Sequence, residues 1–366
     1  MSPDPKPPAG LRADVLNAPA YHFSAKSAPI KLDQNESPYD LPEALKAAVF
    51  KRLSETAFNR YPDLDALSVK RRLAAYHDWP DGGVVVTGGS NILIQAFVMA
   101  AGLGQQVLSV APTFSVYPMQ ANLQGAKRID VPLKANFRLP VAELLEKLKT
   151  GRGVFFLANP AAPTGNTFDE ADIRQLCEAA RDKWLVVLDE AYYQFSSTDL
   201  SPLARDYSHV AVIRTFSKAF GLGGVRLGYG LMQPSLAVQI QKVVMPFSVS
   251  ALQIATAEVV LEAADFVSGR VQEAVAERGK LFSHLSNLPG VTPFESQANF
   301  ILFRVVDAEG FYERLLAQGV LVRRQDHLPG LGGCLRVSVG KPQENDRFLE
   351  AAKIVSEQLS SEVGYG

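Results

Sequence analysis

Apolar and polar residues follow two alternating patterns over the first two thirds of the chain. Short runs of four mostly apolar residues predict buried strands, and these runs begin at Val84, Val107, Val154, Leu185 and Val210. Segments with the helical spacing of apolar residues lie between the runs, as in 92–103 and 169–183. Strands that alternate with helices in this way are typical of a mostly parallel sheet covered on both faces. The pattern therefore predicts the α/β class.

The pattern changes near residue 250. A long helical stretch runs to about residue 280, and shorter strands over 299–305 and 335–339 precede a helix over 344–359. This order predicts a smaller α+β domain, and a chain of 366 residues is long enough for two cores. The expected division is an N-terminal arm (1–40), a large domain (41–250) and a small domain (251–366).

The composition of the chain argues against several classes of protein, including nucleic-acid-binding, membrane-spanning and secreted proteins. The chain is 47% hydrophobic and 20% charged, with a formal net charge of −1, so no basic surplus points to nucleic acid. The longest apolar segment, 92–103, is interrupted by Gln95 and is too short to span a bilayer. The Pro-rich start lacks the apolar core of a secretory signal, and two cysteines suit a reducing compartment. The five histidines show no ligand spacing. We expect a cytoplasmic enzyme without a metal site or membrane segment.

Two charged residues lie where predicted strands end. Lys218 follows the strand at Val210, and Asp189 ends the strand at Leu185. Open α/β sheets bind their ligands at the carboxyl ends of the strands. A carboxylate at such a place is costly unless it meets a cation or a strong donor. Taken alone, Lys218 in its Gly-rich stretch fits either an amine used for chemistry or an incidental surface lysine.

Other strand ends supply groups that suit a phosphate and an aromatic ring. Gly88-Gly89-Ser90-Asn91 opens a helix; Ser90 is a plausible cap, and the free amides there form an anion site. Phe114 follows the strand at Val107 and offers an aromatic face. An amine, a carboxylate, an anion site and a stacking ring at one sheet edge are what a phosphorylated pyridine aldehyde requires.

Longer motifs carry a resemblance to a known family. The segment SKAFGLGGVRLGYG (217–230), with Asp189 and Tyr192, resembles the fold-type I, pyridoxal-phosphate-dependent aminotransferases. The likeness extends over nearly the whole chain and is greatest to the histidinol-phosphate aminotransferases. That closer likeness depends on motifs that include Asn35-Glu36-Ser37-Pro38, Arg60-Tyr61-Pro62 and SQANF (296–300). It implies a large domain with a mostly parallel sheet and a smaller α+β domain.

The resemblance assigns roles around the ring of pyridoxal 5'-phosphate. Lys218 would form a Schiff base with the cofactor and then act as the base that moves a proton. Asp189 would pair with the protonated pyridine nitrogen and so keep the ring an electron sink. Tyr192 would donate to the phenolate oxygen of the ring, and Phe114 would stack on the ring. For Tyr192 and Phe114 the alternative is an ordinary core position.

The phosphate of the cofactor would be held by several groups. The resemblance implies the amides of Ser90 and Asn91, the hydroxyl of Ser217, and Arg226 as a planar donor. Tyr61 resembles a tyrosine that reaches the phosphate from the neighbouring subunit, although a simple Tyr-Pro turn also fits. The implied assembly is a homodimer whose two active sites are shared across the interface.

Substrate recognition is also implied by the resemblance. Arg336 matches the arginine that holds the α-carboxylate of glutamate, and Arg323 matches a second arginine that binds the phosphate of histidinol phosphate. Tyr21 would close the pocket from the partner's arm, and Asn35 would shape it near the substrate ring. For Arg324 a solvated surface position is expected.

The sequence departs from the family at one position. Relatives carry an asparagine before the second proline of the motif at 159–165, and that asparagine donates to the phenolate oxygen. Here the position is Ala162, while Asn159 lies three residues earlier. What replaces the missing donor is left open.

The leading hypothesis is an aminotransferase acting on L-glutamate and imidazole-acetol phosphate. An aromatic amino acid aminotransferase or a threonine-phosphate decarboxylase on the same scaffold would carry most of these motifs. A cofactor-binding regulator without turnover fits less well, because the set Lys218, Asp189 and Tyr192 is intact and the chain has no DNA-binding extension.

Overall fold

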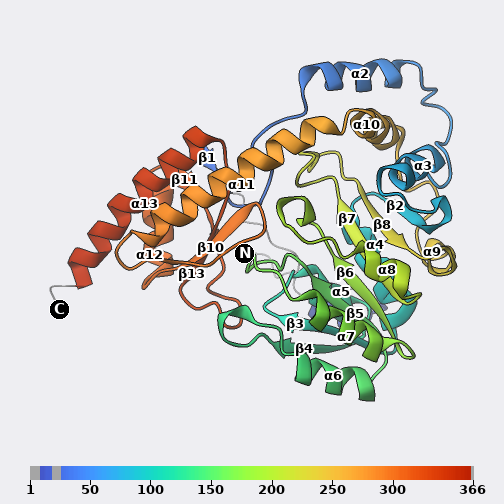
Figure 1. Cartoon of the computed structure of the whole chain (residues 1–366), viewed down its shortest axis with the longest axis horizontal. Coiled ribbons are helices and arrows are strands. Elements are labelled where there is room, and N and C mark those ends of the chain that lie inside the picture. Colours follow the sequence, from blue (N-terminus) through green and yellow to red (C-terminus); the bar gives the residue numbers. More distant parts are fainter. Residues whose placement is uncertain (1–8, 19–25, 364–366) are drawn as a thin grey trace.

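The computed structural model describes residues 9–18 and 26–363. A large sheet covered by helices forms one part of the molecule, and a smaller sheet with its own helices lies beside it (Figure 1). The expected α/β class with a mostly parallel sheet is confirmed.

The large sheet has seven strands. In spatial order they are β2 (Val84–Thr87), β8 (Gly228–Met232), β7 (Val210–Thr215), β6 (Trp184–Asp189), β5 (Gly153–Ala158), β3 (Gln106–Ala111) and β4 (Lys127–Pro132). Among the described strands of this sheet, β8 runs antiparallel to β2 and β7, and the other six run parallel to one another. The five strands predicted from apolar runs are all present in this sheet. Their carboxyl ends lie at one edge, as a parallel arrangement requires.

Helices cover both faces of this sheet because successive side chains of each strand point to opposite sides. Phe155 of β5 belongs to one core and Phe156 to the other. The helices of the first core are α2 (Glu43–Ser54), α3 (Leu67–Tyr76), α6 (Val141–Thr150), α7 (Glu170–Ala180), α8 (Ser201–Asp206) and α10 (Ala251–Glu262). Those of the second core are α4 (Ser90–Phe97), α5 (Val116–Leu123) and α9 (Pro234–Gln241).

Two strands of the large sheet, as the structure describes it, were not predicted from the apolar pattern. The strand β4 lies at the sheet edge and carries charged residues, so it lacks an apolar run. The strand β8 contains Gly228 and Gly230, which resemble the Gly-rich loop before them. A Cβ at Gly228 would overlap the backbone nitrogen of Ser90. The glycine therefore permits β8 to pack against the start of α4.

The smaller part is built around a four-stranded antiparallel sheet. Its order is β12 (Arg323–Arg324), β13 (Cys334–Ser338), β10 (Phe300–Arg304) and β9 (Thr292–Pro293). A parallel pair, β1 (Ile30–Lys31) and β11 (Val320–Leu321), joins the start of the chain to this part. Its core also contains residues of α11 (Asp265–Ser286), α12 (Ala308–Ala317) and α13 (Pro342–Val363). The short helix α1 (Ala13–Asn17) lies against α5.

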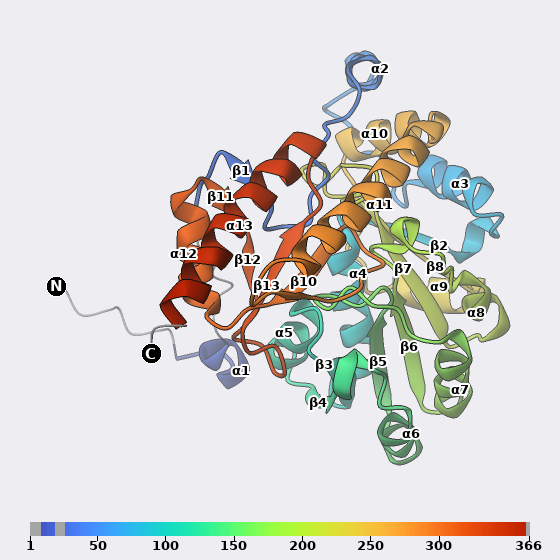
Figure 2. The ribbon, with the colours of Figure 1, turned by 60° about the vertical axis from the view of Figure 1, so that its left-hand side comes forward.

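The helix α11 connects the two parts, and both views show it running from one to the other (Figures 1 and 2). Val267 near its start belongs to the core of the large sheet, while Leu281 and Leu285 belong to the smaller core. The preceding helix α10 is capped by Ser250 and packs against α2 and α3. The division at residue 250 stays a prediction. This packing favours a boundary inside α11.

Candidate active site

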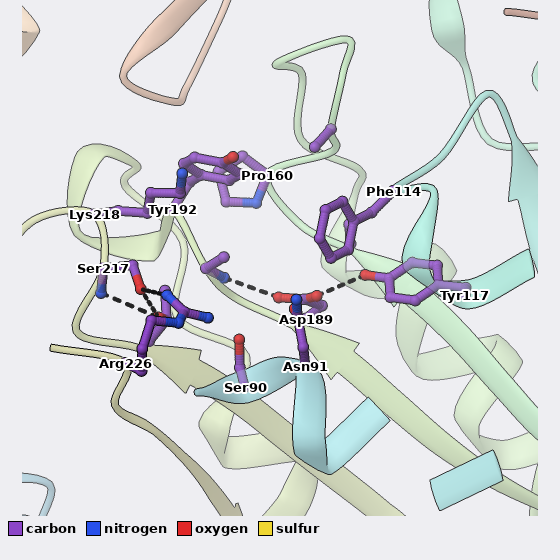
Figure 3. A pocket seen from close by; sticks show the side chains of 14 residues that line it. Ser90, Asn91, Phe114, Tyr117, Pro160, Asp189, Tyr192, Ser217, Lys218 and Arg226 are labelled. Carbon is purple, nitrogen blue, oxygen red and sulfur yellow. Dashed lines mark hydrogen bonds between the residues drawn. The ribbon is translucent and has the colours of Figure 1, made fainter. Parts of the chain in front are cut away.

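A cavity of about 190 Å³ lies at the carboxyl ends of the large-sheet strands (Figure 3). Eight residues predicted for the cofactor site line it: Ser90, Asn91, Phe114, Asp189, Tyr192, Ser217, Lys218 and Arg226. Six further residues complete the lining: Tyr117, Ala158, Pro160, Ala162, Ala191 and Thr215. The structure thus brings together side chains that are up to 136 positions apart in the sequence, from Ser90 to Arg226.

Lys218 lies at the wall of this cavity, in the loop between β7 and β8. Its Nζ donates a hydrogen bond to the backbone oxygen of Gln34 at 3.0 Å and lies 5.6 Å from the ring centre of Tyr192. Sequence reasoning missed the contact with Gln34, because a backbone acceptor leaves no trace in the residue type. The amine is held at the cavity and is not an incidental surface lysine.

Asp189 ends β6 and is buried at the opposite side of the cavity (Figure 3). Its carboxylate accepts hydrogen bonds from the hydroxyl of Tyr117 at 2.7 Å and from the backbone N–H of Ala191 at 3.1 Å. Burial raises the pKa of Asp189 to about 6, although these two donors and the positive charge of Lys218 oppose the rise. Both hydrogen-bond donors are neutral, so the group is well placed to receive a cationic ligand.

Tyr117 is a site residue that sequence reasoning missed. It is fully buried on α5, its ring stacks on Phe156 at 4.9 Å, and it meets Phe114 edge-on at 5.7 Å. Burial and the neighbouring Asp189 raise the pKa of Tyr117 well above its ordinary value, so the hydroxyl remains a donor. The one available signal was its place three residues after Phe114, close behind the end of β3.

The other end of the cavity is suited to an anion. The helix α4 begins here, and its first N–H groups have no partner within the helix. Gly89 is the N-cap residue, so the expectation that Ser90 caps the helix is wrong. Gly89 has a φ of +100°, and a Cβ on it would lie 2.8 Å from the guanidinium of Arg226. The glycine leaves room for that cation beside the helix start.

Arg226 and Ser217 complete this anion site. A guanidinium nitrogen of Arg226 donates to the backbone oxygen of Gly223 at 2.9 Å and to the hydroxyl of Ser217 at 3.4 Å. The hydroxyl of Thr215 donates to Ser217 at 3.0 Å. These contacts hold two donors beside the start of α4 (Figure 3), where the helix dipole also favours negative charge.

A second pocket, of about 200 Å³, adjoins the first and shares Phe114, Ala162, Tyr192 and Lys218 with it. The predicted substrate residues Asn35, Arg323 and Arg336 line it. Two lining residues that the sequence did not single out are Gln325 and His327, in the segment after β12. The pocket is therefore positioned to hold a molecule that reacts at Lys218.

Arg323 and Arg336 are directly opposite each other on the antiparallel strands β12 and β13. Arg336 also donates to the backbone oxygen of Asp33 at 2.9 Å and lies 5.2 Å from the ring centre of Phe300. Two guanidinium groups therefore belong to the wall of the second pocket, which suits an anionic ligand.

One predicted site residue that the structure describes, Tyr61, does not line these pockets. Tyr61 is 82% exposed and stacks on Phe247, with 4.8 Å between ring centres. Tyr21 lies outside the residues that the structure describes. Arg324 forms ion pairs with Glu309 and Asp326, in agreement with a surface role.

Asn159 does not replace the missing side chain at Ala162. It is buried, its amide nitrogen donates to Thr198 at 3.3 Å, and its oxygen accepts from the backbone N–H of Phe168 at 2.8 Å. Neither contact involves a residue that lines the cavity. Ala162 itself lines both pockets, so the donor expected there is absent from the wall.

Comparison with known proteins agrees with this geometry. The family model "Aminotransferase class I and II" matches residues 27–351. A histidinol-phosphate aminotransferase of Deinococcus radiodurans is 44% identical over 354 residues, which cover 96% of this chain and 98% of that protein. A histidinol-phosphate aminotransferase of Ralstonia nicotianae is 42% identical over 348 residues, or 93% of each chain.

Solved structures show the same fold. The crystal structure of the histidinol-phosphate aminotransferase from Clostridium acetobutylicum matches with a TM-score of 0.84, at 21% identity, over 90% of this chain and 99% of that one. The histidinol-phosphate aminotransferase from Sinorhizobium meliloti, in complex with pyridoxal-5'-phosphate, matches with a TM-score of 0.83, at 24% identity, over 91% and 92% of the two chains. From the family match and the sequence identity to these relatives, the chain belongs to the class I and II aminotransferases and, among them, to the histidinol-phosphate aminotransferase family.

Proposed function

We propose that the chain transfers the amino group of L-glutamate to imidazole-acetol phosphate, giving L-histidinol phosphate and 2-oxoglutarate, with pyridoxal 5'-phosphate as cofactor. The observation that carries the proposal is one cavity that joins Lys218, the buried carboxylate of Asp189 and an anion site at the start of α4. Each of the three groups matches one part of the cofactor: its aldehyde, its ring nitrogen and its phosphate.

The residues of the cavity fit this cofactor. The carboxylate of Asp189 is buried among neutral donors, and a protonated ring nitrogen would supply the missing positive charge. The N–H groups of Ser90 and Asn91, with Ser217 and Arg226, would hold the phosphate. When bound, the cofactor supplies an electron sink for the charge that develops at the substrate's α-carbon.

The remaining residues of the first cavity would orient the cofactor and handle protons. Lys218 would hold the cofactor through its aldehyde and then, as a free amine, take the proton from the substrate's α-carbon. Tyr192 would donate to the phenolate oxygen, and Phe114 would cover one face of the ring. The cofactor assignment is tested by borohydride reduction, after which mass mapping should find the pyridoxyl group on Lys218. Label on another residue would refute it.

The second pocket would receive the two substrates in turn. Arg336 and Arg323, on opposite positions of β13 and β12, favour an anionic group between them. A carboxylate of glutamate and the phosphate of histidinol phosphate both meet that requirement. Gln325 and His327 add polar groups to the same pocket.

The substrate is tested by half-reactions, in which the visible absorption of the holoenzyme is followed after a single amine is added. Glutamate and histidinol phosphate should each convert the enzyme, and phenylalanine and threonine phosphate should do so at least 100-fold less efficiently, corresponding to about 3 kcal/mol of lost binding. Comparable conversion by phenylalanine would identify an aromatic aminotransferase. Carbon dioxide release from threonine phosphate would identify a decarboxylase.

The arginines are tested by single substitutions. Arg336→Ala should weaken the use of glutamate and histidinol phosphate alike, by about 2–4 kcal/mol for a lost charge-assisted pair. Arg323→Ala should weaken histidinol phosphate more than glutamate. Arg324→Ala is the matched control, since its partners are Glu309 and Asp326. Equal use of histidinol with and without its phosphate would contradict the proposed substrate.

The proposed assembly is a homodimer in the cytoplasm. Tyr61 and Phe247 form an exposed aromatic pair, and Phe58 and Met245 expose further apolar surface close to them in the sequence. A partner subunit on this surface would bury it and carry Tyr61 to the partner's phosphate site. Met245→Glu should then halve the mass measured by light scattering, and a monomeric parent protein would refute the proposal. Cys177 and Cys334 are buried and unpaired, which suits the cytoplasm.

A further inference from the structure

The segment Asp33–Asn35 links the smaller sheet to the cavity. The backbone oxygen of Asp33 accepts from Arg336, the backbone oxygen of Gln34 accepts from Lys218, and the side chain of Asn35 contacts Tyr192. Asn35 is 1% exposed and has a φ of +54°, a conformation that asparagine tolerates better than most residues. Asn35 was expected to shape the pocket near the substrate ring; it lines that pocket, and both polar atoms of its side chain bond to protein groups.

The contacts of Ser338 determine which way the Asn35 amide faces. The backbone N–H of Asn35 donates to the Ser338 hydroxyl at 2.8 Å, and that hydroxyl donates to the Asn35 side-chain oxygen at 3.2 Å. The amide nitrogen therefore faces the hydroxyl oxygen of Tyr192, at 3.0 Å. An amide nitrogen can only donate, so the Tyr192 oxygen accepts this bond and its own hydrogen stays available for another acceptor.

We propose that Asn35 is a positioning residue that aims the hydroxyl hydrogen of Tyr192 at the phenolate oxygen of the cofactor. The inference rests on the proposed function, since it needs pyridoxal phosphate in the cavity. Ala162 offers no donor, and Asn159 is bonded elsewhere. Tyr192 therefore carries this donation without a second donor at position 162, and Asn35 prevents its hydroxyl from turning away.

The expected consequence is visible in the absorption spectrum. A donor to the phenolate oxygen stabilises its negative charge and so lowers the pKa of the chromophore that forms at Lys218. The visible absorption reports the protonation of this chromophore. A spectrophotometric pH titration of the holoenzyme therefore measures the donation by Tyr192 without any turnover.

Asn35→Asp is the sharpest test, because it keeps the shape of the side chain and reverses the hydrogen bond. A carboxylate can only accept, so it would draw the Tyr192 hydrogen away from the phenolate. The pKa of the chromophore should rise by about 1 unit, the size of one ordinary hydrogen bond. Asn35→Ala leaves the hydroxyl free to rotate and should give a smaller rise.

The control is the same pair of substitutions in a Tyr192→Phe background. A new negative charge alone would raise the pKa of the chromophore equally in both backgrounds. A lost hydrogen bond from Tyr192 to the phenolate oxygen can raise it only in the parent, because phenylalanine has no hydroxyl. We expect Asn35→Asp to raise the pKa of the chromophore in the parent by clearly more than in the Tyr192→Phe protein. If Asn35→Asp does not fold, the same comparison with Asn35→Ala decides the question.

Three outcomes are distinguishable. A larger rise in the parent than in the Tyr192→Phe background supports the inference. Equal rises, or no rise in the parent, overturn it and leave the proposed function intact; no rise would also mean that the Asn35 amide faces the other way. A parent protein that forms no visible chromophore with pyridoxal phosphate removes the proposed function, and the inference with it.

Discussion

Asp189 and Glu190 are neighbours at the end of β6, yet their carboxylates have opposite surroundings. Asp189 faces the cavity and accepts from the Tyr117 hydroxyl and a backbone N–H. Glu190 faces the core on the other side of the sheet, where one oxygen accepts two bonds from Arg214, at 2.7 and 2.9 Å. Its second oxygen accepts from the backbone N–H of Leu200 at 2.7 Å. Both side chains are buried, but only Glu190 contacts a cation of the chain directly.

The difference separates a structural charge from one that is ready for a ligand. Burial alone would raise the pKa of Glu190 and lower that of Arg214, and the attraction between the two charges opposes both changes. For Arg214 the result is a pKa above its ordinary value, so its charge persists. Burial raises the pKa of Glu190 to about 7 in spite of this contact, and it raises the pKa of Asp189, which has no such contact, to about 6. A buried carboxylate held by neutral donors in a cavity is a site for a cationic ligand.

The core side has its own titratable neighbour in His77. Arg214 donates to Nδ1 of His77 at 3.0 Å, and Nε2 lies 2.8 Å from the Tyr229 hydroxyl. Burial and the charge of Arg214 lower the pKa of His77 to about 3. His77 therefore stays neutral and accepts a bond from Arg214, as part of the network that holds Glu190. The contributions of His77 and Asp189 to stability should consequently change with pH in opposite directions.

The largest effect is expected when the core pair is broken. Glu190→Gln removes the charge that matches Arg214 and should lower the free energy of unfolding by about 3 kcal/mol, as for other buried ion pairs that lose one partner. Urea unfolding at pH 7.5, followed by circular dichroism, measures the change. A loss below about 1 kcal/mol would mean that Asp199, which also contacts Arg214 at 2.6 Å, is sufficient.

The same chemical change one residue earlier should have the opposite sign. In the cofactor-free protein, Asp189→Asn removes a carboxylate whose pKa is raised from 3.8 to about 6. Such a group destabilises the folded state above its ordinary pKa, so the parent loses stability as the pH rises from about 4 to about 6. The substitution should stabilise the cofactor-free protein by about 3 kcal/mol at pH 8 and about 1 kcal/mol at pH 4.5.

The holoenzyme is the second measurement for this substitution. Without the carboxylate, the charged ring nitrogen loses its partner, and transamination should fall by about 10²–10³-fold. If the Asp189→Asn protein were less stable than the parent without cofactor and fully active with it, Asp189 would be a structural carboxylate like Glu190, and the contrast between the two would be wrong. Glu190→Gln serves as the matched comparison, because each substitution replaces one carboxyl by an amide of equal size.

The fold and the centre of the site followed from the sequence because apolar runs mark buried strands and the chemistry lies where those strands end. Lys218, Asp189 and Ser90 could be brought together by that rule alone. The strand β8 could not be predicted, since its glycines are required by close packing against α4, which only the folded chain shows. The ion pair between Glu190 and Arg214 could not be predicted either, because the sequence does not show which of the adjacent residues Asp189 and Glu190 faces the core and which faces the cavity.

Other parts of the site depend on contacts that residue types do not reveal. Tyr117 has the sequence context of a core aromatic residue, and only its distance to Asp189 gives it a role. Gln34 contributes a backbone oxygen to Lys218, and Asn35 bonds to Tyr192, which follows 157 residues later. The role proposed for Tyr61 involves a second subunit, so a single chain does not test it. Local patterns thus predict elements and their ends, whereas partners across the fold require the structure.

His77→Gln tests the pH response of the core side. The lowered pKa means that the folded protein stays neutral at His77 while the unfolded chain gains a proton below about pH 6.5. The parent should lose stability through this group as the pH falls, by about 2 kcal/mol at pH 5 relative to pH 8. Glutamine can still accept a hydrogen bond from Arg214 but does not titrate, so the His77→Gln protein should not show this loss of stability at low pH. Equal acid loss in both proteins would show that His77 titrates normally.

Tyr117→Phe should give the smallest effect and isolates the cavity side. The ring contacts with Phe156 and Phe114 remain, and only the hydroxyl that donates to Asp189 is removed. That donor stabilises the ionised carboxylate, so its loss should raise the pKa of Asp189 further and lower the stability of the cofactor-free protein at pH 8 by about 1 kcal/mol. At pH 4.5, where Asp189 is protonated in the folded state, the loss of stability should be smaller.

The control is Tyr117→Phe in the Asp189→Asn background. There the pH dependence of the loss should disappear, because no charge is left to stabilise. An equal loss of stability at both pH values would assign the effect to packing. The ionised carboxylate of Asp189 would then be stabilised by the backbone N–H of Ala191 and not by Tyr117.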